Sequence, residues 1–145
     1  MRVLGLFLLL LMLLGTVMAQ EEPDFCRFYT YAEATKLARE YPDRVLLLYF
    51  RSNHCPYCAQ METFVLGDPE VTEQLARCFV VGTVTLEKAP ELFKRHGVRG
   101  TPFFLFLRYD PARKTWVELG RVFGSMPRST FLDKLRAVCD GRSER

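Results

Sequence analysis

Two cysteines separated by two residues lie shortly after an apolar run. The apolar run is Val45–Phe50 and the cysteine motif is Cys55-Pro56-Tyr57-Cys58. A continuous apolar run of this length is typical of a strand that is covered on both faces. The motif then stands where the strand ends and a helix begins, and the unpaired N–H groups of a helix start favour a thiolate over a thiol. Because the thiolate is the species that attacks disulfides, the pattern indicates a site for disulfide exchange.

Two other interpretations of the cysteine pair fit the sequence less well. A structural bridge between Cys55 and Cys58 would contribute little stability, because the loop it closes is short. A structural zinc site normally needs four ligands, and the sequence has no second Cys-x-x-Cys motif. Pro56 fits the first turn of a helix, since the N–H it lacks would be unpaired there anyway. The redox interpretation is therefore favoured.

The size and charge of the chain limit the classes of function. Its 145 residues suit one domain, and 49% of them are hydrophobic, which is enough for a substantial core. The formal net charge is +3, and no cluster of Lys and Arg stands out. We therefore expect no nucleic-acid partner.

The first 19 residues have the pattern of an export signal. Arg2 is the lone charge, residues 3–14 are mostly leucine, and Ala19 ends a segment of small or modest side chains. We expect cleavage after Ala19, which leaves residues 20–145 as one domain in the periplasm or another exported, oxidising compartment. The alternative is an uncleaved membrane anchor, for which the uncharged stretch is short.

Hydrophobic periodicity and turn residues predict an α/β domain with a mixed sheet and helices on both faces. The predicted order along the chain is a short strand at Phe25–Phe28, a helix at Thr30–Tyr41, a strand at Val45–Phe50, a helix at Cys58–Leu66, a helix capped by Asp68 with Pro69 first, a strand at Phe79–Leu86, a helix at Ala89–His96 closed by Gly97, strands at Phe103–Arg108 and Thr115–Phe123, antiparallel to each other, and a helix at Arg128–Cys139.

Three motifs together resemble the thioredoxin fold over Phe25 to Cys139. They are the Cys55–Cys58 motif after a strand, Val98-Arg99-Gly100-Thr101-Pro102 before a strand, and Gly124 before the last helix. The segment Leu66-Gly67-Asp68-Pro69-Glu70-Val71 resembles the exported branch of this superfamily. That branch includes the thioredoxin-like protein of bacterial sulfur-oxidation gene clusters and the C-terminal domain of the transmembrane disulfide reductase.

The resemblance implies a role for each motif. Cys55 is the expected attacking thiolate, and Cys58, one turn into the helix, is the expected resolving thiol. The bond between Thr101 and Pro102 is expected to be cis, so that the Thr101 backbone faces an extended substrate strand. Gly124 is expected on the same rim, where it allows close backbone approach. The alternatives are an ordinary trans turn at Pro102 and a simple strand terminator at Gly124.

The residues around the first cysteine are expected to tune its reactivity. His54 stands where thioredoxin has a tryptophan, and as imidazolium it would stabilise the Cys55 thiolate. The alternative is a solvated loop histidine. Pro56 and Tyr57 resemble the glutaredoxin dipeptide more than the Gly-Pro of thioredoxin.

One residue departs from the family pattern. Thioredoxin and the reductase domain carry a buried aspartate six residues before the first cysteine, a candidate proton acceptor for the resolving thiol. This chain has Tyr49 there, and a tyrosine with a pKa near 10 is a poor base at neutral pH. Glu62 is a candidate substitute, although we expect it to be a solvated helix residue. Whether the protein mainly reduces or mainly oxidises its clients is left open.

Three further cysteines, Cys26, Cys78 and Cys139, are predicted at the pole of the sheet opposite the motif. We expect one structural disulfide among them, which leaves an odd thiol, and the sequence does not say which two pair. The alternative is three small buried side chains.

These features predict an exported thiol-disulfide oxidoreductase that exchanges electrons with the cysteines of client proteins. Its redox centre is the Cys55–Cys58 disulfide, with no separate cofactor and no metal. By resemblance, clients belong to sulfur-oxidation carriers or cytochrome c maturation, and a membrane reductase or oxidase is the electron partner. We expect a monomer. The alternative function is a Cu(I) carrier that uses Cys55, Cys58 and either His54 or Met61, since soft thiolates suit Cu(I).

Overall fold

The structure is a computed structural model that describes Arg2, Val3, Gly5 and residues 20–143. Most of the expected export signal, residues 1–19, therefore lies outside the described residues. The elements are β1 (Phe28–Thr30), α2 (Tyr31–Glu40), β2 (Val45–Arg51), α3 (Pro56–Met61), a π-helical segment η1 (Glu62–Leu66), α4 (Pro69–Cys78), β3 (Phe79–Thr85), α5 (Pro90–His96), β4 (Phe103–Asp110), β5 (Thr115–Phe123) and α6 (Arg128–Ser143).

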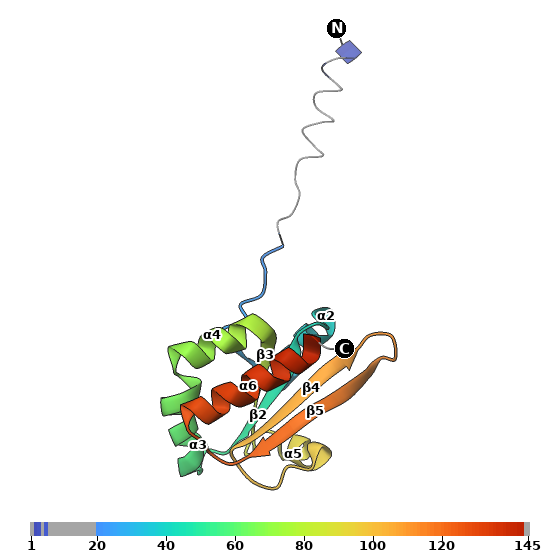
Figure 1. Cartoon of the computed structure of the whole chain (residues 1–145). Helices are drawn as coiled ribbons and strands as arrows, with labels where there is room; N and C mark the ends of the chain where they lie inside the picture. Colours follow the sequence, from blue (N-terminus) through green and yellow to red (C-terminus); the bar gives the residue numbers. More distant parts are fainter. Residues whose placement is uncertain (1, 4, 6–19, 144–145) are drawn as a thin grey trace.

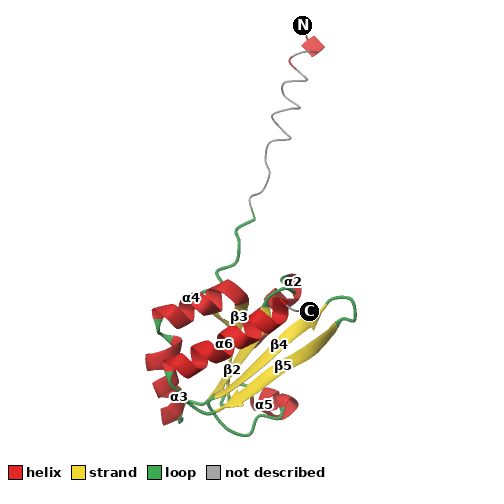
Figure 2. Ribbon diagram, in the orientation of Figure 1, coloured by secondary structure: helices red, strands yellow, loops and turns green. Residues whose placement is uncertain are grey.

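The strands form a five-stranded mixed sheet in the order β1-β3-β2-β4-β5. Strands β1, β3 and β2 run parallel, whereas β4 is antiparallel to both β2 and β5. The mixed sheet and the antiparallel pairing of β4 with β5 confirm the prediction from the sequence pattern, which did not extend to the order of the strands in the sheet. Figure 1 and Figure 2 show α4 and α6 lying across one face of the sheet.

Alternate residues of β2 point into two separate cores, which explains the unbroken apolar run. Val45, Leu47 and Tyr49 pack with α3, η1, α4 and α6. Leu46 and Leu48 pack on the other face with α2 and α5. The helices therefore cover both faces of the sheet, as expected, and β2 is the central strand that carries the cysteine motif.

Most predicted elements agree with the structure to within one or two residues, but α6 runs to Ser143 rather than Cys139, and the first strand and the redox helix also have different bounds. The edge strand lies at Phe28–Thr30 rather than Phe25–Phe28, because Phe25 packs instead against the ring of Tyr41 and beneath the guanidinium of Arg44. The helix predicted at Cys58–Leu66 begins at Pro56 and changes to a π-helix at Glu62. Met61, Val65 and Leu66 form the buried face of this segment.

Several local predictions are confirmed. Asp68 caps α4, and its Oδ1 accepts a hydrogen bond from the N–H of Glu70 at 2.9 Å. Gly97 closes α5 with a left-handed φ of 67°. A disulfide joins Cys78 at the end of α4 to Cys139 in α6, while Cys26 is exposed and unbridged. Within the described residues, no helix is long and apolar enough to cross a membrane.

Candidate active site

Cys55 begins the helix that carries Cys58. Its backbone is extended (φ −125°, ψ 97°), and its Sγ accepts a hydrogen bond from the N–H of Cys58 at 3.1 Å. Pro56 takes the first helical position, as predicted. The two sulfurs are joined in a disulfide across a Cα–Cα distance of 5.2 Å. The helix start therefore holds the dithiol in bonding reach and provides an N–H donor to the Cys55 sulfur.

The two cysteines differ in their access to solvent. Cys55 is partly exposed, whereas Cys58 is 0% exposed and belongs to the buried face of α3. An incoming protein disulfide can therefore reach the sulfur of Cys55 and not that of Cys58. Tyr57 between them is exposed, so it faces any partner that approaches Cys55.

The loop before β4 lies at the same edge of the sheet as the cysteines. The register places Phe50, near the end of β2, opposite Phe103 at the start of β4. The peptide bond between Thr101 and Pro102 is cis, as predicted, and Thr101 is partly exposed. The cysteine loop and the cis-proline loop are therefore neighbours at one end of the molecule.

Gly124 is tied to the same loop by its backbone. Its N–H donates a hydrogen bond to the carbonyl oxygen of Pro102 at 2.8 Å. Its φ of 97° lies in the region that L side chains rarely adopt, and a Cβ there would meet no protein atom within 4 Å. Backbone conformation, and not crowding by the rest of this chain, therefore requires glycine at this position.

A carboxylate that the sequence did not single out anchors the loop before Cys55. Glu87, after β3, accepts hydrogen bonds from the Ser52 hydroxyl at 2.6 Å and the Asn53 N–H at 3.0 Å. The Ser52 hydrogen bond is the main cause that lowers the pKa of Glu87, and the charge of His54 also contributes. The imidazole of His54 is exposed, and its backbone N–H donates to Ser52 Oγ at 3.3 Å.

Tyr49, which occupies the position of the family aspartate, makes an apolar contact there. Its ring stacks on Phe104 with centroids 5.1 Å apart, and its buried hydroxyl has no hydrogen-bond partner among the described residues. Burial raises the pKa of Tyr49 far above its usual value, and the negative charge of Glu62 raises it further. Tyr49 therefore stays protonated at neutral pH, in keeping with the prediction that it is a poor base.

The environment of Glu62 differs from the expectation of a solvated side chain. Its Oε1 accepts a hydrogen bond from Arg51 Nε at 2.8 Å, and both side chains are partly shielded from solvent. Arg51 also donates from Nη1 to Asn53 Oδ1 at 3.0 Å. An ion pair therefore lies beside Tyr49 and links the redox helix to the end of β2.

No group of three His, Cys, Asp or Glu side chains placed to hold a metal ion is found in the part of the chain that the structure describes.

Comparisons with known proteins identify the family. The family model of the thioredoxin-like domain matches residues 31–138 of the sequence. A thioredoxin from Thermus thermophilus is 48% identical, with a TM-score of 0.71, over 78% of this chain and 86% of that one. The oxidised C-terminal domain of Neisseria meningitidis DsbD is 22% identical, with a TM-score of 0.57, over 77% of this chain and 98% of that one, and shows the same fold.

A longer curated protein also matches. The thiol:disulfide interchange protein DsbD of Photorhabdus laumondii is 26% identical in an alignment of 151 positions that covers 93% of this chain. The chain spans about a quarter of that relative, since the match covers 26% of its length. The chain therefore belongs to the thioredoxin-like domain family and is a thioredoxin-like oxidoreductase whose Cys-x-x-Cys disulfide joins Cys55 and Cys58.

Proposed function

We propose that the protein is an exported thiol-disulfide oxidoreductase that exchanges electrons with the cysteines of client proteins. One observation carries the proposal. A partly exposed Cys55 sulfur at a helix start is bonded to a fully buried Cys58, at the sheet edge where the cis-proline loop lies. Because of this asymmetry, Cys55 can react with a client disulfide, and Cys58 can then attack Cys55 and release the client.

In the reducing direction, the Cys55 thiolate attacks one sulfur of a client disulfide. A bond forms between the two proteins and the other client sulfur leaves as a thiolate. Cys58, as a thiolate, then attacks the Cys55 sulfur, which re-forms the internal disulfide and releases the second client thiolate. Two electrons pass from the protein to the client, and the oxidising reaction is the same sequence in reverse.

The rim of the site would hold the client backbone. The cis bond leaves Thr101 partly exposed beside the cysteine loop, where its backbone groups can pair with an extended client segment. Gly124 keeps the neighbouring turn open, since its backbone is bonded to Pro102 and it carries no side chain. Thr101, Pro102 and Gly124 are accordingly the substrate-binding residues of the proposal.

We assign the proton from the buried thiol to Glu62. Its N–H bonds to the Cys58 carbonyl, so it lies one helical turn after Cys58. Arg51 holds the carboxylate in place, whereas burial keeps Tyr49 protonated. Exposed His54, as imidazolium next to Cys55, would stabilise the thiolate at mildly acidic pH, and Pro56 and Tyr57 would set the shape around it.

The proposal also includes the compartment in which the protein works. The leucine-rich start of the sequence supports export, and residues 20–145 would then work in an oxidising compartment as a monomer. The curated relative is named a thiol:disulfide interchange protein, which supports disulfide exchange with protein clients. A membrane reductase or oxidase as the electron partner is part of the proposal that the sequence resemblance alone implies.

The test is the reduction of insulin disulfides with dithiothreitol as the electron source. The wild-type protein should accelerate insulin precipitation, and Cys55→Ser should abolish the effect. Cys26→Ser is the matched control, because Cys26 is exposed and unbridged. Full activity in Cys55→Ser would refute the proposal.

The alternative function, a Cu(I) carrier, is tested by competition for Cu(I) against a chelator. For a carrier, Cys58→Ser should weaken Cu(I) binding as much as Cys55→Ser does.

A further inference from the structure

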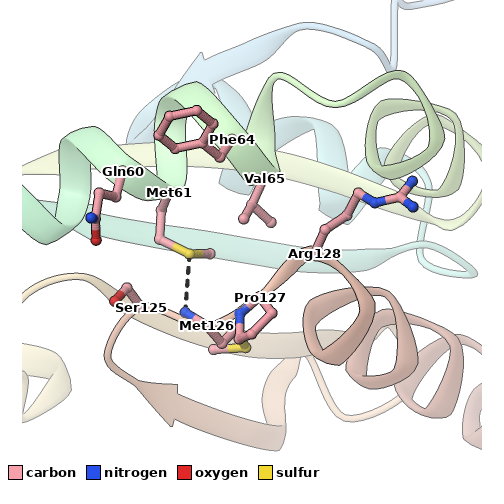
Figure 3. A pocket seen from close by; sticks show the side chains of 8 residues that line it. All are labelled: Gln60, Met61, Phe64, Val65, Ser125, Met126, Pro127 and Arg128. Carbon is pink, nitrogen blue, oxygen red and sulfur yellow. Dashed lines mark hydrogen bonds between the residues drawn. The ribbon is translucent and has the colours of Figure 1, made fainter.

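A hollow of about 410 Å³ lies beside the redox helix, between the α3–η1 segment and the connection from β5 to α6 (Figure 3). Four of its residues come from the helical segment and four from the connection and the start of α6. They are Gln60, Met61, Phe64, Val65, Ser125, Met126, Pro127 and Arg128. Volumes of this size are within the range of sites that bind small molecules or side chains.

The floor of the hollow is held by two methionines. Met61 points from α3 toward the connection, and its Sδ accepts a hydrogen bond from the Met126 N–H at 3.3 Å (Figure 3). Met61 and Val65 are buried and belong to the core beneath. The floor is therefore fixed by packing, while its surface remains soft, because methionine side chains are flexible and polarisable.

One aromatic side chain at the rim of the hollow is exposed to solvent. Phe64 is 70% exposed, and its ring points away from the side chains of Met61 and Val65 (Figure 3). Met61, Val65 and Leu66 form the buried face of the segment, and Phe64 lies off that face. A large apolar side chain left in solvent beside an apolar hollow is the kind of feature that marks a binding surface.

The charge of the rim is already neutralised. Arg128, at one end of the hollow, donates to Glu70 Oε2 at 2.7 Å and lies 3.5 Å from Asp68 Oδ1. The remaining polar side chains of the lining are the neutral Gln60 and Ser125. The hollow therefore suits an uncharged apolar group rather than an anion.

The hollow is lined by residues that adjoin the redox site along the chain. Met61 lies three residues after Cys58 on the same helix, and Ser125 follows Gly124, whose N–H is bonded to Pro102. A client segment that presents a sulfur to Cys55 and follows the rim past Gly124 would bring a neighbouring side chain over the hollow.

The geometry points to a specificity subsite in this hollow for one large apolar side chain, such as Phe, Leu or Met, close in sequence to the client's reacting cysteine. The assignment rests on the proposed function, since the occupant is part of a client protein. It adds a preference between clients that the cysteines and the backbone rim do not provide.

The test uses the reduced full chain and short peptides whose cysteine is in a mixed disulfide with thionitrobenzoate. Every protein in these assays, the one called wild type included, carries Cys26→Ser, because the exposed thiol of Cys26 would react with the same disulfides. Attack on the peptide sulfur releases coloured thionitrobenzoate, which gives a second-order rate constant. One phenylalanine is moved stepwise along either side of the cysteine, with an all-serine peptide as reference. We expect the best phenylalanine peptide to react about tenfold faster than the reference, the effect of partly burying one aromatic side chain.

Two variants locate the preference. Phe64→Ser should lower the ratio between the best phenylalanine peptide and the serine peptide about threefold or more, the loss of part of an apolar contact. Val117→Ser is the matched control, because Val117 is a partly exposed apolar residue of β5 that pairs with Arg108 near the β4–β5 turn, away from the hollow and the cysteine loop, and it should leave the ratio unchanged. Equal rates for all peptides, or a ratio that Phe64→Ser does not change, would overturn the subsite.

The result remains informative if the proposed function fails. Mercaptoethanol in mixed disulfide with the same chromophore should react with the wild type, and no reaction would refute the redox proposal by itself. Calorimetric titration with the S-methylated phenylalanine peptide then tests the hollow, where binding that Phe64→Ser removes supports it and no binding overturns it. A dimer that depends on Phe64 in sedimentation would also overturn it, since a second copy would be the occupant.

Discussion

Removing the disulfide between Cys78 and Cys139 should strongly destabilise the protein without touching the redox motif. The bridge joins residues 61 positions apart and pins the end of α4 to α6. The chain-entropy relation for a closed loop of this length gives about 4 kcal/mol of stabilisation at 25 °C. For a domain of this size, that corresponds to a fall of roughly 10–20 °C in Tm.

The assay is thermal and guanidinium unfolding of Cys78→Ala/Cys139→Ala against the wild type, both in a Cys55→Ser/Cys58→Ser background. In that background, a reductant acts on the α4–α6 bridge alone and should lower the Tm of the parent to that of the variant. Cys26→Ala is the control and should change Tm little, because Cys26 is exposed and unbridged. A Tm within about 3 °C of the parent would refute the reasoning, since it corresponds to less than about 1 kcal/mol.

Three further predictions concern single side chains around the sheet. Tyr49→Phe removes a buried hydroxyl that lacks a described partner, so the free energy of unfolding should change by less than about 1 kcal/mol and insulin reduction should be unaffected. Glu62→Gln removes the proposed proton acceptor, so mixed disulfides on Cys55 should persist about tenfold longer or more at pH 7 in quenched-flow mass spectrometry. Burial, and secondarily the charge of Arg95, lowers the pKa of His96, so the folded state should lose stability as pH falls below about 6.5, and denaturation of His96→Gln between pH 7 and pH 5 should show a weaker loss.

Local patterns predicted the parts of the site that depend on neighbours in the sequence. The apolar run before Cys55 marked the central strand, and Pro56 at the first helical position marked the helix start. The fold resemblance predicted the cis bond before Pro102, which the structure confirms. The expected disulfide among the three remaining cysteines is also present, although its pairing needed the spatial arrangement of α4 and α6.

The parts that sequence reasoning missed depend on contacts between distant residues. Glu87 is 35 residues from Ser52, and no pattern around either residue indicates that they bond. Glu62 was expected in solvent because its partner, Arg51, is on a strand and not on the same helix face. The change from α-helix to π-helix at Glu62 was also missed, because the buried positions Met61, Val65 and Leu66 fit the periodicity of an ordinary α-helix.

The most direct test of the account is to trap the covalent intermediate. Reduced Cys58→Ser and Cys55→Ser proteins, both in a Cys26→Ser background that removes the exposed free thiol, are each mixed with a protein disulfide, quenched with acid and mapped by mass spectrometry. The account predicts a stable adduct on Cys55 in Cys58→Ser, because no second thiol is left to release it, and no comparable adduct in Cys55→Ser. An adduct on Cys58 in Cys55→Ser, with none on Cys55 in Cys58→Ser, would contradict the assignment of the two sulfurs.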